Sequence, residues 1–208
     1  LYGIMNASVH RDVKKMLAFC TSENIGIIGM GIGMALIGKA MGNQWISTLG
    51  FSAALLHVLN HSLYKSLLFF GSGNIYLQTH TRNMELLGGL IRFMPVTAAA
   101  FLIGSLAIGG IPPFNGFISK FLIYSGFLET LKQKDIAMSL LMIISTAILS
   151  MAGGVSMLAF TKAFGTIFLG EPRTEQHHKP AEAPWTMQIP VMLIITMMVF
   201  IGLFPQLI

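Results

Sequence analysis

The chain has 208 residues, of which 54% are hydrophobic and only 10% are charged. A mean hydropathy of +0.72 is far above that of a soluble domain, so the composition indicates an integral membrane protein that contacts the lipid bilayer. The net charge of +5 comes from bases scattered between apolar stretches, without the basic stripe and interleaved aromatic residues of a nucleic-acid surface. A soluble domain and a nucleic-acid partner are therefore excluded.

Several apolar stretches are long enough to cross a bilayer, which takes about 20 helical residues. In chain order, the expected helices cover residues 1–9, 16–38, 45–77, 93–128, 136–170 and 187–204. The first of these looks like the end of a helix, and we expect the chain to be a piece of a longer protein. Because no alternating strand pattern competes with the helical stretches, the sequence predicts an all-α polytopic integral membrane protein.

The run IPPFNG, residues 111–116, interrupts the apolar stretch 93–128. Two consecutive prolines remove backbone donors and obstruct the preceding helical turn, so a continuous helix is not expected there. We predict one discontinuous helix with its break inside the membrane. The alternative is a loop between two short spans, which would place Lys120 at a wet interface.

Basic residues are divided unequally between the loops on the two sides of the membrane. One side has Arg11, Lys14, Lys15, Arg82, Arg92, Arg173 and Lys179, and the other has Lys39, Lys132 and Lys134. Because cytoplasmic loops carry an excess of Lys and Arg, the first side is predicted to face the cytoplasm. The cytoplasmic loops would then be residues 10–15, 78–92 and 171–184, with the chain in the cell (inner) membrane.

Two histidines and a lysine lie within the apolar stretch 45–77. A lysine near the bilayer centre costs about 2.5 kcal/mol or more, so it is retained only with partners or water around it. His57, His61 and Lys65 are spaced four residues apart and share one helix face. With Asn60 and Tyr64 nearby, this face predicts a proton relay. The alternative is that the histidines bond neighbouring helices and the lysine reaches the membrane interface.

Other charged residues inside spans are weaker candidates for the same relay. Lys120 follows the proposed helix break by four residues, where transporters place ion sites. Glu23 is the acid well inside a span and is expected to be the electrostatic partner of a lysine, unless it is only paired structurally near the cytoplasmic end. Lys162 is expected to extend toward the loop surface more than to relay protons, and Lys14 is a further secondary candidate.

Motifs for cofactors and catalytic chemistry are missing from the sequence. It has no CxxC pair, no glycine-rich dinucleotide motif and no cluster with metal-ligand spacing. Cys20 is interpreted as a core residue, and His177 and His178 as solvated loop residues. We therefore expect no cofactor, no metal and no redox active site on this chain, and its part in any enzyme would be that of a membrane subunit.

Four runs of the sequence resemble one family of membrane proteins. They are DVKKMLAFCTSENIGIIGMGIG, HVLNHSLYKSLLFFGSGNI, TRNMELLGGLIRFMP and GIPPFNGFISKFLIY. They are similar to the proton-conducting, antiporter-like subunits of respiratory complex I, Mrp-type antiporters and membrane-bound hydrogenases. The forms SENIG, LNHSLYKS and FLGEPR are most similar to the hydrogenase 4 and formate hydrogenlyase branch.

This resemblance implies two inverted five-helix repeats, each with a broken helix and a half-channel. Residues 1–170 would be the second repeat, starting inside its first helix, followed by a cytoplasmic loop at 171–184 and a C-terminal transmembrane helix at 185–208. It also implies that Lys65, His57 and His61 form the central relay and that Lys120 feeds the exit path. The first half-channel is absent, so another part of the protein or another subunit would supply it.

The resemblance leaves two classes of function open. In the first, the chain translocates protons or cations as a subunit of a redox-driven complex, with other membrane subunits and a peripheral redox arm as partners; an Mrp-type antiporter subunit is a variant of this class. In the second, it is a non-pumping anchor for a peripheral hydrogenase. Lysines kept inside the membrane favour the first class.

Overall fold

The computed structural model describes residues 1–133, 135–173 and 179–207. Its helices are α1 (Tyr2–Val9), α2 (Val13–Ala40), α3 (Gln44–Thr79), α4 (Pro95–Gly109), α5 (Asn115–Leu131), α6 (Ile136–Phe168) and α7 (Trp185–Leu203), with short 3-10 turns η1 (Met84–Leu86), η2 (Leu90–Arg92) and η3 (Pro205–Leu207). Within the described ranges, the sole β-type pairing is an isolated bridge between Asp12 and Asn83. The predicted all-α fold class is confirmed.

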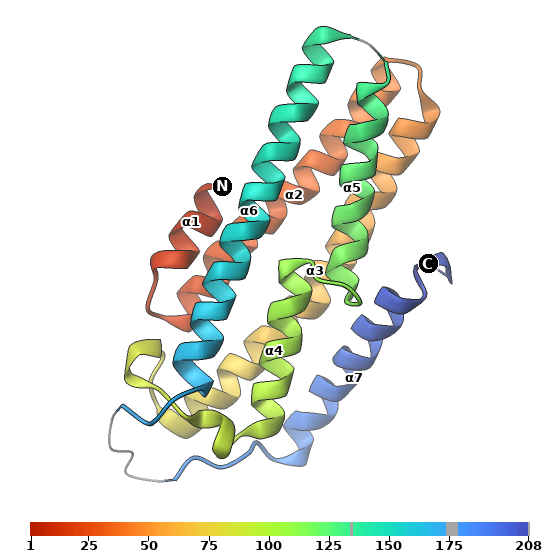
Figure 1. The fold of residues 1–208 in the computed structure, drawn as a ribbon. Helices are drawn as coiled ribbons and strands as arrows, with labels where there is room; N and C mark the ends of the chain where they lie inside the picture. The colour runs from red at the N-terminus through yellow and green to blue at the C-terminus, as the bar shows by residue number, and fades with distance from the viewer. Residues whose placement is uncertain (134, 174–178, 208) are drawn as a thin grey trace.

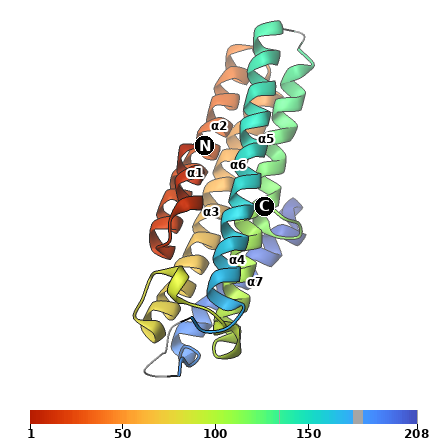
Figure 2. The ribbon, with the colours of Figure 1, turned by 60° about the vertical axis from the view of Figure 1, so that its left-hand side comes forward.

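The helices form an elongated bundle in which the chain alternates between two ends (Figure 1). α2 and α3 make an antiparallel pair, and α6 runs along the bundle back toward the end where α3 finishes, as both views show (Figure 2). The connections α1–α2, α3–α4 and α6–α7 meet at one end, and α2–α3 and α5–α6 meet at the other. These are the two groups of loops that the sequence distinguished by their basic residues; Lys134 lies outside the described residues.

Short polar side chains begin the long helices. Asp12 accepts hydrogen bonds from the backbone N–H groups of Lys14 and Lys15 at 2.8 and 3.1 Å, and Asn43 and Asp135 cap α3 and α6 in the same way. The expected loop at 129–135 is shorter than predicted, because α5 continues to Leu131. An i to i+3 ion pair between Glu129 and Lys132, at 2.6 Å, lies at that helix end.

Helix lengths fit a membrane-spanning bundle. α2, α6 and α7, with 28, 33 and 19 residues, are long and apolar enough to cross a bilayer. α3 has 36 residues and extends about 54 Å, which exceeds the hydrocarbon thickness of roughly 30 Å. Large apolar side chains on the outside of the bundle remain exposed, such as Leu158 at 67% on α6 and Leu193 at 58% on α7. The chain is therefore integral to the membrane.

α4 and α5 together form one discontinuous spanning segment. Their 15 and 17 residues give lengths of about 22 and 26 Å, so neither crosses the hydrocarbon core alone. α5 continues beyond the end of α4 toward the opposite end of the bundle (Figure 1). Residues 110–114 separate the two half-helices and include a cis peptide bond between Pro112 and Pro113. The predicted broken helix is confirmed.

Glycines let α2 and α3 approach closely near one end of the bundle. A Cβ atom added to Gly50 would lie 2.6 Å from the backbone nitrogen of Ala35, and one added to Gly38 would lie 2.5 Å from the nitrogen of Ser47. Both distances are too short for any side chain. This close pairing fixes the register of the two helices and hence of the polar side chains farther along them.

Candidate functional site

The broken end of α4 is completed by a lysine from α5. Gly110 adopts φ +82°, and its N–H bonds to the carbonyl of Ala107 at 3.0 Å. Pro112 has no N–H, so the carbonyl of Ile108, four residues earlier, lacks its helical partner. Lys120 Nζ donates to that carbonyl at 2.8 Å. The ammonium thus lies at the negative end of the α4 dipole, inside the membrane.

Lys120 and the start of α5 are held tightly against this break. Lys120 is 7% exposed, and a Cβ atom on Gly110 would lie 3.0 Å from its Cδ. A Cβ atom on Gly116 would collide with the carbonyl oxygen of Ala107. Since both glycines allow close approach, the two half-helices meet with a cation enclosed between them.

A second polar group joins α2, α3 and α5 around His57, which is fully buried. Its Nδ1 lies 2.8 Å from Ser119 Oγ, and its Nε2 lies 3.1 Å from Asn24 Oδ1. Asn24 Nδ2 donates to the Cys20 carbonyl at 2.8 Å, which fixes Oδ1 as the acceptor. Tyr64 donates its hydroxyl to the same oxygen at 2.7 Å. His57 Nε2 therefore carries a hydrogen, and Nδ1 is the atom that can gain or lose a proton.

The Ser119 hydroxyl can form a hydrogen bond with His57 in either protonation state of the imidazole. When Nδ1 is bare, the Ser119 hydroxyl donates to it. When Nδ1 is protonated, it donates to Ser119 Oγ, and the hydroxyl can turn to the Gly116 carbonyl at 3.4 Å. Asn60 Nδ2 donates to Ser119 Oγ at 3.1 Å in both cases. The site can thus hold a neutral or a charged imidazole without losing its hydrogen bonds.

Asn60 also ties this site to the break. Its Nδ2 donates to the backbone carbonyl of Asn115 at 2.8 Å, and Asn115 Nδ2 donates back to Asn60 Oδ1 at 3.1 Å. Both amides are fully buried. The first turn of α5 is therefore fixed to the middle of α3 by reciprocal side-chain bonds.

Lys65 faces α2 near the end where the basic loops gather. Its Nζ donates to the Leu17 carbonyl at 2.5 Å, and the side chain is 6% exposed. Leu17, Cys20 and Asn24 follow one face of α2 at helical spacing. Lys65 and His57 thus contact the same face of α2, about two turns apart.

Glu23 is buried at 4% exposure and makes no direct ion pair with a lysine in the part of the chain that the structure describes. Cys20 donates its thiol to Glu23 Oε2 at 3.3 Å, while Oε1 has no hydrogen-bond partner among the described residues. The nearest partner of Glu23 is thus a thiol, because Cys20 lies one turn before it on the same helix, and its part as the electrostatic partner of a lysine stays a prediction.

His61 is only half-buried. Its ring lies edge-on to Tyr64 with centroids 5.6 Å apart, and its Nε2 is without a hydrogen-bond partner in the described ranges. His57, His61 and Lys65 are therefore not linked to one another by direct hydrogen bonds. Tyr64, between them on α3, bonds to Asn24 of α2.

Lys162 and Lys14, the weaker candidates for the relay, lie against residues outside the polar groups described above. Lys162 is exposed, and its Nζ lies 3.4 Å from the Ser8 carbonyl. Lys14 Nζ lies 5.1 Å from the centre of the Tyr76 ring. His177 and His178 lie outside the described residues, among which no group of three His, Cys, Asp or Glu side chains could hold a metal ion.

Functional contacts that the sequence did not predict involve Ser119, Asn115 and the carbonyls that bind the lysines. A usable signal existed for the first two, because Asn115 and Ser119 are four residues apart and share a face of α5. No sequence signal identifies a backbone carbonyl as the partner of Lys65.

These features define a class of protein, namely a polytopic membrane bundle with a proline-broken helix and titratable groups enclosed between its helices. A family model described as "NADH:quinone oxidoreductase/Mrp antiporter, TM" matches residues 1–150. The chain belongs to this family.

Relatives and a solved structure agree with this assignment. The chain is 38% identical over 203 residues to hydrogenase-4 component B of Escherichia coli (strain K12), covering 98% of this chain and 30% of the relative. It is 36% identical over 189 residues to formate hydrogenlyase subunit 3 of the same organism, covering 91% and 31%. The Mrp complex from Dietzia sp. DQ12-45-1b has the same fold, with a TM-score of 0.77 at 22% identity, covering all of this chain and 42% of that one. The chain spans less than a third of the length of the two Escherichia coli relatives.

Proposed function

We propose that this chain is part of a proton-translocating membrane subunit of a redox-driven complex of the membrane-bound hydrogenase kind. The observation that carries the proposal is the line of enclosed titratable groups, with Lys65 and His57 on α3 and Lys120 at the break in the helix. The names of the relatives, a hydrogenase-4 component and a formate hydrogenlyase subunit, support the choice of complex.

Other membrane subunits are the partners in this proposal, together with a peripheral arm that carries the redox chemistry. This chain then needs no cofactor of its own. The complex resides in the cell (inner) membrane, with loops 10–15, 78–92 and 171–184 in the cytoplasm, as their basic residues favour.

In the proposed mechanism Lys65 is the switch. Its ammonium is held by the Leu17 carbonyl, and the carboxyl group of Glu23, on the same helix α2, adds negative charge that favours the protonated form. When that charge is neutralised or moves away, Lys65 releases a proton, which passes by way of His61 to His57 Nδ1. Ser119 turns as His57 changes state, and Lys120, the next residue on α5, receives the proton for the exit path.

The test is the substitution Lys65→Arg in the assembled complex reconstituted in proteoliposomes. A guanidinium keeps the positive charge but does not release its proton in proteins, so proton uptake per electron should fall to background while redox turnover is measured in parallel. Lys162→Arg is the matched control, since Lys162 is exposed and its Nζ bonds to the Ser8 carbonyl of α1.

Wild-type pumping by Lys65→Arg would contradict the switch and favour a purely structural role for this cation. Proton uptake driven by a sodium gradient without redox turnover would favour the antiporter variant instead.

A further inference from the structure

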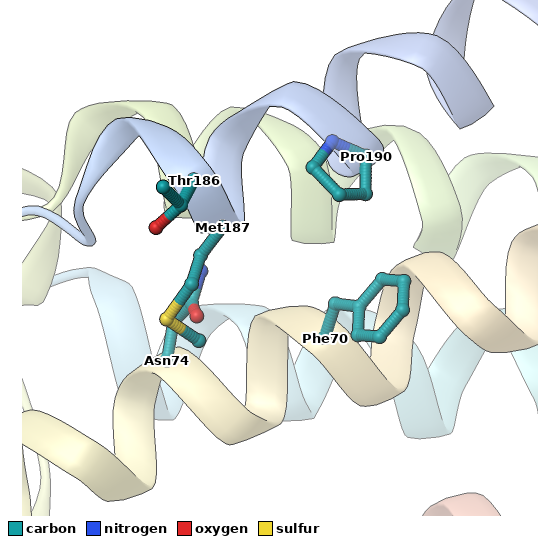
Figure 3. A pocket seen from close by; sticks show the side chains of 5 residues that line it. All are labelled: Phe70, Asn74, Thr186, Met187 and Pro190. Atoms are coloured by element: carbon teal, nitrogen blue, oxygen red, sulfur yellow. The ribbon is translucent and has the colours of Figure 1, made fainter.

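A cavity of about 220 Å³ opens between α3 and α7, away from the relay. It is lined by Phe70, Asn74, Thr186, Met187 and Pro190, and Figure 3 shows the side chains of Asn74 and Met187 directed toward one another across the gap. Asn74 lies five residues before the end of α3, and Thr186 is the second residue of α7. The cavity is therefore close to the end of the bundle at which the basic loops gather.

Residues of α7 next to the cavity lining are exposed on the outside of the bundle. Trp185, the first residue of α7, is 77% exposed, and Ile189, one turn later, is 61% exposed. Exposed tryptophan is typical of the membrane interface. A lipid at the membrane interface can therefore reach this opening.

Asn74 presents an unmatched acceptor in this mostly apolar cavity. Its side chain is 3% exposed, and Nδ2 lies 3.4 Å from Thr97 Oγ1. Thr97 gives its single hydroxyl hydrogen to Glu182 at 2.5 Å, so it can only accept from Asn74. This fixes the orientation of the amide, and its Oδ1 has no donor among the residues that the structure describes.

Pro190 creates a second acceptor on the opposite wall. Because proline has no N–H, the carbonyl of Thr186, four residues earlier in α7, lacks its helical hydrogen bond. Helical carbonyls point toward the C-terminus, so this one points toward Pro190, and both residues line the cavity. The two acceptors thus belong to helices on opposite sides of the cavity, and Asn74 Oδ1 has no donor among the described residues.

We propose that this cavity binds the primary ammonium head of an aminophospholipid such as phosphatidylethanolamine. Its N–H groups would donate to Asn74 Oδ1 and to the Thr186 carbonyl, and its apolar part would extend along Phe70 and Pro190. The Glu182 carboxylate, which two hydrogen bonds link to Asn74 through Thr97, favours a cation over a neutral hydroxyl. The cavity volume equals that of about seven water molecules, which is enough for an ammonium group and the carbons attached to it.

The test compares two lipids with the same net charge, one with a primary ammonium and one with a trimethylammonium that has no N–H donor. Phosphatidylethanolamine and phosphatidylcholine with identical acyl chains are exchanged into the delipidated complex, and retained lipid is counted by native mass spectrometry. The wild type should retain the ethanolamine lipid about tenfold better, since only its ammonium can donate hydrogen bonds to the two acceptors. This readout does not depend on proton pumping, so its failure is separate from failure of the proposed function.

Two variants remove the acceptors one at a time. Asn74→Leu deletes the amide, and Pro190→Ala restores an N–H that pairs the Thr186 carbonyl while favouring the helix. Each should reduce the preference for the ethanolamine lipid, whereas Asn6→Leu, an Asn substitution on α1, should leave it unchanged. Equal retention of the two lipids by the wild type, or a preference that survives both cavity substitutions, would overturn the proposal.

Discussion

The Ser119 hydroxyl lies between a ring nitrogen and an amide, 2.8 Å from His57 Nδ1 and 3.1 Å from Asn60 Nδ2. Asn60 can only donate to it through Nδ2, so the single hydrogen of Ser119 remains free to follow the state of His57. At the residue scale, a relay therefore depends on a neutral side chain as well as on the titratable ones.

Ser119→Ala should slow proton uptake while leaving the fold intact. Removing the hydroxyl leaves His57 Nδ1 without its partner, and a positioned proton-transfer group contributes roughly a hundredfold or more to a rate. Proton uptake and redox turnover in proteoliposomes measure the effect. Ser156→Ala is the matched control, because Ser156 is also fully buried but its Oγ has no partner in the described part of the chain. Unchanged uptake in Ser119→Ala would remove Ser119 from the pathway.

The sequence predicts the burial of the ionisable residues in this site but not their hydrogen-bond partners. Burial of Lys65, Lys120 and His57 could be predicted, because ionisable groups in apolar helices must face protein or water. Their partners could not, since two are backbone carbonyls and Ser119 is separated from His57 by 62 residues. Such contacts depend on how helices pack, which helical periodicity does not specify.

At the scale of elements, α7 and the segment before it contact both ends of the half-helix α4. Glu182 accepts hydrogen bonds from the backbone N–H groups of Val96 and Thr97, at 2.7 and 3.3 Å, and so caps the start of α4. Near the other end of α7, a Cβ atom on Gly202 would collide with the carbonyl of Pro113 in the break. α7 therefore supports a half-helix that is too short to span the membrane alone.

Gly202→Val should loosen the break. The added side chain would push α7 away from residues 113 and 114, and overpacking of this kind typically costs about 1–3 kcal/mol. Amide hydrogen exchange of residues 109–116 in the purified complex should become faster. Gly154→Val on α6 is the control, since a Cβ there meets nothing within 4 Å. Equal protection in both variants would show that α7 does not support the break.

The break itself could be predicted from sequence, whereas its support could not. Pro112 and Pro113 determine locally that α4 must end, because they lack donors. Glu182 lies 86 residues after Val96, and nothing in the hydropathy of the chain pairs them. The extension of α5 to Leu131 was also missed, because charged residues at a helix end look like a loop.

At the scale of the whole molecule, the three loops at one end of the bundle are bonded to one another. Val13 N–H donates to the Arg82 carbonyl at 3.0 Å, and Gly89 N–H donates to the Leu169 carbonyl at 3.0 Å. Arg173 adds side-chain bonds to the carbonyls of Leu87 and Thr166, at 2.6 and 3.0 Å. Loops bonded in this way must lie on the same side of the membrane, so the orientation of one loop gives the orientation of all three.

Cysteine labelling in intact cells should determine which end of the bundle faces the cytoplasm. The native Cys20 is fully buried, so its background labelling should be low, while Glu171 and Gln133 are exposed at opposite ends of the bundle. Because the end that includes Glu171 has the larger number of bases, Glu171→Cys should resist a membrane-impermeant maleimide until the cells are opened, and Gln133→Cys should react from outside. The reverse pattern would invert the orientation of the chain, and with it the side from which Lys65 takes up protons.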